Sequence, residues 1–183
     1  MDRRDLIKAF GAIAVSASFL SACGRSETGE LEAIYTPSFY GPTVFALVAR
    51  VSDVLIPTTQ TPGALAVGVP EMLDHLMLDW ADAATGKANI ADWGKIDAVL
   101  SSTLGQPNKA SDADFTKAVQ ALDAQAFGEG RDEHGAYRRQ KSLIAQAYYW
   151  SEPGATEELQ YELNPVELIV CGPIDEIGRT WFR

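Results

Sequence analysis

The stretch PTVFALVARVSDVLIP, residues 42–57, decides the fold class of this chain. Its apolar residues recur three or four positions apart, which is the spacing of a helix that buries one face. They are Val44, Leu47, Val48, Val51, Val54 and Leu55. Pro57 lacks a backbone N–H and cannot continue a helix, so we predict a helix that ends just before it.

The same period continues on the carboxyl side of this stretch. Pro70 suits the first turn of a second helix, whose polar residues, Asp74 among them, fall mostly opposite its apolar stripe. We predict Asn89 as the N-cap of a third helix, and Ser111 with Asp114 as the capping box of a fourth. The predicted apolar stripes are Met72, Leu73, Leu76, Met77 and Trp80; Ile90, Trp93, Ile96, Val99, Leu100 and Leu104; Phe115, Ala118, Val119 and Leu122; and Tyr137, Leu143, Ile144, Ala147 and Tyr148.

The region after residue 160 has a different pattern, because two prolines and two glycines interrupt it around one short apolar run, Leu168–Val170. Before this region, no alternation of apolar and polar residues is long enough for a convincing strand. We therefore predict an all-α fold with a single domain over residues 36–183. It has about five helices and an irregular, extended C-terminal arm from about residue 161.

The first 23 residues have the layout of an export signal. Arg3 and Arg4 form a pair near the start, and an uncharged apolar run of about 12 residues follows. The run ends in Leu20-Ser21-Ala22-Cys23, which resembles the bacterial lipobox. Paired arginines indicate the twin-arginine route. The apolar run is too short to span a bilayer core, which needs about 20 residues.

We therefore predict two segments at this end of the chain. Residues 1–22 form a signal peptide, and residues 23–35 form a flexible tether. The protein is periplasmic, and acyl chains on Cys23 attach it to the membrane.

Charge excludes one class of partner. The whole chain has 183 residues, 46% of them hydrophobic, and a net charge of −10. Because residues 1–22 carry a net charge of +1, the remainder is near −11. A globular chain of this charge offers no basic stripe for nucleic acid and little electrostatic attraction to anionic lipid.

The twin-arginine route carries folded proteins, often with a cofactor, but the sequence contains none of the common cofactor motifs. It has no dinucleotide-binding glycine fingerprint, phosphate-binding loop, haem-attachment motif or zinc-protease motif. Two explanations remain. Either the chain folds too fast for the unfolded-chain route, or it carries out a folded, cofactor-loaded partner. We predict no cofactor in this chain.

Few residues are candidates for chemistry. His75 lies four residues from both Glu71 and Asp79, a row that could hold a metal but is more often a solvated acidic face. His134 lies in a predicted turn. If Cys23 is lipidated, Cys171 is the one thiol left, and it is a free thiol, a partner for another chain or an inert buried residue. We predict no catalytic or metal-binding residue.

Two features point to a partner surface. The prolines and glycines between the first two helices make a rigid loop, which either recognises a partner or only sets the angle between the helices. The run Tyr148-Tyr149-Trp150 cannot face one core, because successive helical side chains turn by about 100°. The interface candidates are Pro57, Pro62, Gly63, Gly68, Pro70, Tyr149, Trp150, Cys171 and Trp181.

Several short runs carry a family resemblance. Ser52–Pro57, Thr61–Ala64 and Gly68–Asp74 resemble the signature of the gluconate 2-dehydrogenase subunit 3 family. Tyr148–Glu152 and Gly154–Leu159 resemble the second half of the same family. Within it, the chain is most similar to small subunits of sugar and glucoside 3-dehydrogenases.

The resemblance implies a non-catalytic small subunit. Its partner would be an FAD-dependent large subunit of the glucose-methanol-choline (GMC) type, often with a cytochrome c that takes the electrons. The small subunit would supply the twin-arginine signal and stabilise the large one. In related glucose dehydrogenases a disulfide joins the two, and Cys171 is the candidate here. Two alternatives stay open: a stand-alone envelope lipoprotein that binds a small ligand or a protein, and an enzyme that uses His75 or His134.

Overall fold

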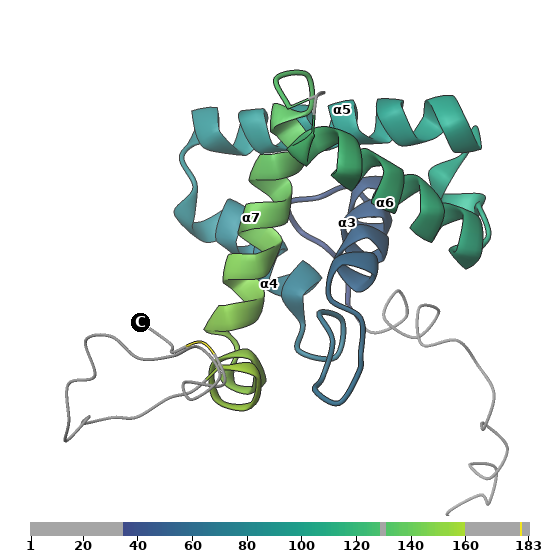
Figure 1. The fold of residues 1–183 in the computed structure, drawn as a ribbon. Coiled ribbons are helices and arrows are strands. Elements are labelled where there is room, and N and C mark those ends of the chain that lie inside the picture. The colour runs from purple at the N-terminus through teal and green to yellow at the C-terminus, as the bar shows by residue number, and fades with distance from the viewer. Residues whose placement is uncertain (1–34, 129–130, 160–179, 181–183) are drawn as a thin grey trace, which may run out of the picture. The chain divides into compact units, whose positions relative to one another are not determined.

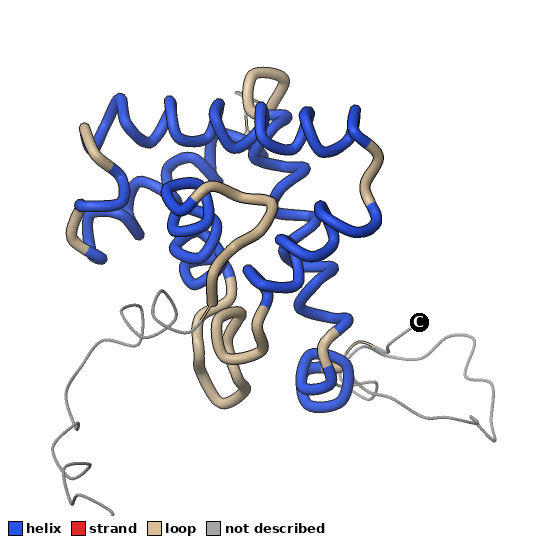
Figure 2. The backbone as a smooth tube through the Cα atoms, turned by 180° about the vertical axis from the view of Figure 1, so that it is seen from behind, coloured by secondary structure: helices blue, strands red, loops and turns tan. Residues whose placement is uncertain are grey.

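The computed structural model describes residues 35–128, 131–159 and 180. The chain divides into two units, residues 1–33 and 34–183, and every described residue belongs to the second. Its described residues form five α-helices and include no strand, so the predicted all-α class is confirmed (Figures 1 and 2). The helices are α3 (Pro42–Leu55), α4 (Val69–His75), α5 (Ala83–Leu104), α6 (Asp112–Phe127) and α7 (Gly135–Trp150).

Three short helical turns complete the described elements. They are the π-helical turns η1 (Leu76–Trp80) and η3 (Gly154–Glu158) and the 3₁₀ turn η2 (Pro107–Lys109). The predicted C-terminal arm lies almost wholly outside the described residues.

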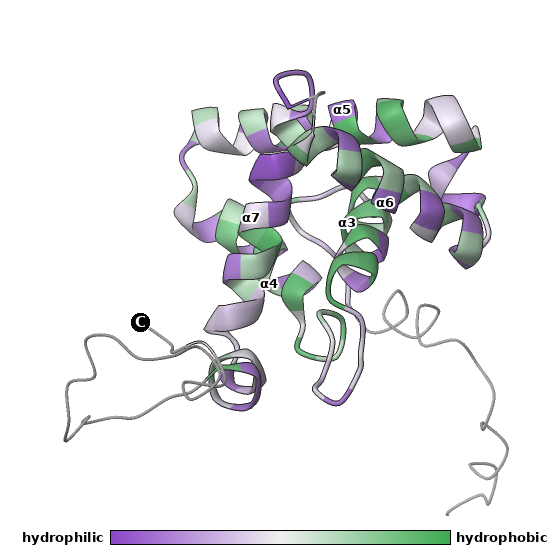
Figure 3. Ribbon diagram, in the orientation of Figure 1, coloured by the Kyte–Doolittle hydropathy of each residue, from purple (hydrophilic) through white to green (hydrophobic). Residues whose placement is uncertain are grey.

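The helices enclose one core. α5 crosses one end of α7 and packs on it and on α6, while α4 lies between α3 and α7 (Figure 1). In Figure 3, α3 is apolar along much of its length, as its sequence period predicts. Each helix contributes fully buried side chains to the core, including Val48, Leu73, Trp93, Phe115 and Ile144.

The helix ends are partly as predicted. α3 ends at Leu55, Pro70 lies in the first turn of α4, and the Ser111 hydroxyl caps α6 by accepting from the Asp114 N–H. The prediction for Asn89 is wrong. α5 begins at Ala83 with Asp82 as its N-cap, so Asn89 lies inside the helix. The first turns of α5 contain mainly small and polar residues, which carry no apolar period to reveal them.

Asp74 also differs from the prediction, since it is completely buried rather than on the polar face of its helix. Its carboxylate accepts hydrogen bonds from the Tyr35 hydroxyl at 2.9 Å and from the backbone N–H groups of Ser38 and Tyr40, both at 2.7 Å. The Phe39 N–H also donates, at 3.1 Å. The chain entering the domain thus covers this face of α4 and supplies the partners that a buried carboxylate needs.

Trp80 is a third error in the predicted pattern, and Ile90, which the stripe of α5 was predicted to bury, is also exposed, at 38%. With helical spacing Trp80 would join Leu73 and Met77 in the core, but it is 85% exposed. The reason is that η1 follows α4 directly and has a π-helical turn. A π turn takes more residues than an α turn, so Trp80, the last residue of η1, is rotated away from the predicted stripe.

We predict that Asp74→Ala lowers the free energy of unfolding by at least about 3 kcal/mol, because it leaves several buried donors without an acceptor. Urea denaturation of the wild type and the variant measures this difference. Asp79→Ala is the matched control: its side chain is 56% exposed and pairs only with His75, at 3.6 Å, so a change within about 0.5 kcal/mol is expected. Equal effects of the two substitutions would contradict the role given to Asp74.

Candidate partner interface

The loop between α3 and α4 folds closely on itself. The Ala64 N–H donates to the Ile56 carbonyl at 2.8 Å, and the Val69 N–H donates to the Ala64 carbonyl at 3.0 Å. Gly63 lies so near the other side of the loop that a Cβ there would be 2.4 Å from the Thr58 backbone nitrogen. Gly68 has a φ of 73°, a conformation that glycine adopts without strain. The loop therefore has the rigid shape that its prolines and glycines predict.

The loop is also joined to the carboxyl end of α7. The Tyr148 hydroxyl donates to the Pro62 carbonyl at 2.9 Å, and the Thr61 hydroxyl donates to Glu158 in η3 at 3.0 Å. Figure 1 shows the loop and this end of α7 at the same end of the helical domain. Between them lies a polar cleft of about 640 Å³, which we call the loop cleft. It is lined by Thr59, Gln60, Thr61, Tyr149, Glu157, Glu158, Leu159 and Thr180.

The predicted interface residues separate by exposure. Pro57 is exposed, and Pro62 and Gly68 are half-buried. Gly63 and Pro70 are buried within this chain, so they shape the loop but present no surface. The remaining candidates at this end belong to the aromatic run of α7.

The three aromatic residues at the end of α7 differ in exposure, as expected. Tyr148 is buried, Tyr149 is half-buried at the loop cleft, and Trp150 is 57% exposed. Burial and the nearby Glu158 carboxylate raise the pKa of Tyr149, so the phenol stays protonated at neutral pH. The prediction that this run cannot all face the core is confirmed.

The titratable candidates do not form a metal site in the part of the chain that the structure describes, where no three acidic, histidine or cysteine side chains converge. His75 lies 3.6 Å from Asp79 on an exposed surface. Glu71 is half-buried, and burial raises its pKa. His134 precedes the first turn of α7 and is half-buried. Arg3, Arg4, Cys23, Cys171 and Trp181 lie outside the described residues.

A second surface was not predicted. Leu78 and Ile90, which are 47% and 38% exposed, line a groove of about 500 Å³ between η1 and the start of α5, and Trp80 at the end of η1 is 85% exposed. We call this surface the Trp80 face. The groove is lined by Phe39, Met77, Leu78, Ala81, Asp82, Ala83, Gly86, Lys87 and Ile90. One signal was available in the sequence: Leu78 is a large apolar residue off the predicted stripe of its helix.

The family model described as gluconate 2-dehydrogenase subunit 3 matches residues 42–165. The chain belongs to the gluconate 2-dehydrogenase subunit 3 family. Comparisons with curated proteins and with solved structures gave no match. The matched span includes the described residues of α3 to η3, and therefore most of the loop cleft and of the Trp80 face.

Membership of the gluconate 2-dehydrogenase subunit 3 family makes the protein a dehydrogenase subunit and implies association with a catalytic subunit. Among the described residues of this subunit, none of the helices combines the length and the apolar character needed to cross a bilayer.

We predict that Gly63→Ala lowers the free energy of unfolding by about 1–3 kcal/mol, because the new methyl group overlaps backbone atoms that cannot move independently. Gly94→Ala is the control. A Cβ at Gly94, inside α5, meets nothing within 4 Å, so this change is expected to stabilise by about 0.5–1 kcal/mol. Thermal and urea unfolding measure both, and a neutral Gly63→Ala would show that the loop is not tightly closed.

Proposed function

We propose that this protein is a non-catalytic subunit that binds, co-exports and stabilises an FAD-dependent catalytic subunit of the GMC type. The observation that carries the proposal is the family match over residues 42–165, because the family is that of a dehydrogenase's third subunit. The substrate is a sugar or glucoside oxidised by the partner, and FAD belongs to that partner. A cytochrome c that accepts the electrons would complete the complex.

The surface of the subunit supports a binding role. Two tryptophans, Trp80 and Trp150, are more than half exposed on a small helical domain. Tryptophan is enriched at the centre of protein interfaces, where its burial on binding contributes strongly to affinity. The core beneath them is filled by the chain's own aromatic and aliphatic side chains.

The export part of the proposal depends on residues outside the described structure. Arg3 and Arg4 supply the twin-arginine signal, and Cys23 supplies the lipid attachment site that holds the complex at the membrane in the periplasm. A small subunit with the signal explains how a folded, FAD-loaded partner without one could leave the cytoplasm.

The paired arginines give a direct test. We expect Arg3→Lys with Arg4→Lys to remove most of the catalytic subunit from the periplasm while the cell still makes it, because the twin-arginine machinery requires the pair. Immunoblots of periplasm and whole cells measure both amounts, and Asp2→Asn is a control that changes charge beside the intact pair. Full periplasmic delivery by the double variant would contradict the carrier role.

The odd cysteine motivates a second test. If Cys171 forms a disulfide with the catalytic subunit, the purified complex runs as one band without reductant and as two bands with it. Cys171→Ser should run as two bands under both conditions. Two bands from the wild type without reductant would discard the disulfide but not the complex.

Purification of the full-length protein from its own organism tests the whole proposal. A flavoprotein in equal amount, with the absorption spectrum of FAD, is expected. Its absence would contradict the proposal and favour a stand-alone lipoprotein, for which the loop cleft is the described candidate binding site.

A further inference from the structure

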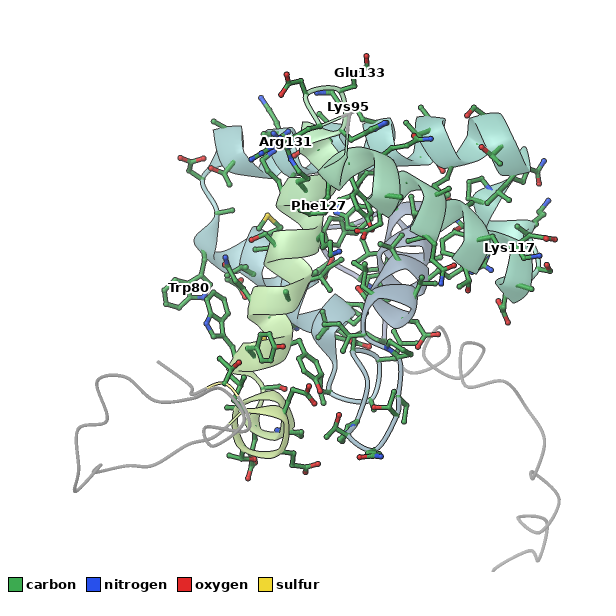
Figure 4. All side chains as sticks on the ribbon, in the orientation of Figure 1. Trp80, Lys95, Lys117, Phe127, Arg131 and Glu133 are labelled. Carbon is green, nitrogen blue, oxygen red and sulfur yellow. The ribbon has the colours of Figure 1, made fainter. Side chains whose placement is uncertain are left out.

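The Trp80 face includes Trp80, which has the highest exposed fraction among the large apolar side chains of the described residues. Trp80, at the end of η1, is 85% exposed and projects away from the helices (Figure 4), while Leu78 and Ile90 are exposed along the groove between η1 and α5. Full burial of a large apolar side chain is worth about 1.5–3 kcal/mol, so this arrangement gives up stability of the isolated chain. Contiguous exposed apolar residues of this kind mark interaction sites.

The local backbone produces this exposure. A continuous α-helix through Leu76–Trp80 would place Trp80 on the buried stripe, and the π turn η1 moves it to the surface instead. π turns are frequent at functional sites. The turn therefore creates the Trp80 face at the cost of one large core side chain.

The groove has a defined shape before any partner arrives. Met77 is buried at its base, and Phe39 forms a wall whose backbone N–H is held by Asp74. Gly86 allows the Phe39 ring to pack closely, because a Cβ there would lie 3.2 Å from the ring. A groove held in this way loses little conformational freedom when a side chain enters it.

The charged side chains near the groove favour a basic partner segment. Asp79 and Asp82 stand on either side of Trp80 in the sequence, and both are exposed. Asp82 lines the groove, and Lys87 is the one cationic side chain among the residues that line it, so the two carboxylates leave an acidic excess beside the groove. The Thr85 backbone N–H donates to Asp82 and lowers its pKa, so this carboxylate is ionised at any physiological pH. A second copy of this chain would bring the same acidic pair and a further net charge of −10, and an anionic lipid surface would meet the same repulsion.

We propose that the Trp80 face is the docking site for an apolar segment of the catalytic subunit that presents a lysine or arginine to Asp79 and Asp82. An apolar side chain of that segment enters the groove between Leu78 and Ile90, and Trp80 at the end of η1 packs against the same segment. The inference rests on the proposed function, since it assigns the surface through which that partner is held.

The test uses the flavoprotein that co-purifies with the wild-type chain, co-expressed with full-length variants. Trp80→Ala and, independently, Leu78→Glu are expected to weaken the complex by about 30-fold or more, the effect of losing a central interface side chain. Phe127→Ala is the matched control, because Phe127 is also exposed, at 58%, and contacts Lys141 on another part of the surface (Figure 4). It should bind within about threefold of wild type. Circular dichroism and thermal unfolding show that each variant is folded.

A separate double variant tests the role of Asp79 and Asp82. Asp79→Asn with Asp82→Asn removes both charges, and asparagine at position 82 preserves the N-cap of α5. We expect a several-fold slower association at low salt and a weaker dependence of association on salt, because the attraction between the two subunits has been reduced. Unchanged association kinetics would overturn the assignment of a basic partner segment.

The remaining outcomes are distinct. If the wild type binds no flavoprotein, the proposed function fails first. If the wild type binds it and both Trp80→Ala and Leu78→Glu bind equally well, the docking site is wrong while the proposed function stands. In that case, loss of dimers in sedimentation or of binding to phosphatidylglycerol vesicles by Trp80→Ala would reassign the face to a second copy or to the membrane.

Discussion

The Asp74 carboxylate is the interaction on which the described fold depends. A buried carboxylate is costly unless hydrogen bonds replace its lost water, and here one hydroxyl and three backbone N–H groups do so. All four donors come from residues 35–40, so this one side chain fixes the path by which the chain enters the domain. Tyr35, the last residue of the predicted tether, then stacks on Phe45 of α3, with ring centres 5.3 Å apart.

The same segment extends the polar contacts into the core. The Tyr40 hydroxyl donates to Asn89 of α5 at 2.8 Å, and the Asn89 amide donates to Gln140 of α7 at 3.2 Å. All three side chains are buried. Because buried polar groups must keep their partners, this chain of bonds permits one relative arrangement of α5, α7 and the entering segment. Through Tyr40, Asp74 thus links α4 to α5 and α7, and through Phe39 it also sets one wall of the groove.

The predictable part of the fold is the part governed by local periodicity. α3, α6 and α7 bury the stripes expected from spacing alone, and the Ser111 cap follows from the preference of helix ends for hydroxyl side chains. Asn89 and Asp74 were misplaced for one shared reason. Polar residues are expected at caps or in solvent unless distant residues satisfy them, and their partners lie 34–51 positions away in the sequence. No local pattern carries that information.

The features of the candidate interface also fall into two groups, those that local sequence rules predict and those that they do not. The rigid loop and the outward Trp150 could be predicted, because the conformational limits of proline and glycine and the 100° helical turn act locally. The Trp80 face could be predicted only in part: Leu78 lies off the predicted stripe, but the exposure of Trp80 depends on a π turn, which shifts the helical phase without a clear sequence signal. Leu78 and Trp80 are large apolar residues, and their exposure follows from the path of the backbone through η1.

The two surfaces differ in the chemistry they offer, and this bears on how a subunit with so small a core can hold a larger partner. The loop cleft is lined mainly by hydroxyl, amide and carboxylate groups that water can also satisfy, so contacts there add selectivity more than affinity. The groove at the Trp80 face is mainly apolar, and its burial releases water from side chains that find no other cover in the described domain. Since Asp74 holds Phe39 in place, the interaction that closes the fold also keeps that groove open. The hydrogen bonds of Asp74 therefore stabilise the domain and also keep the groove at the Trp80 face in a shape that can bind a partner.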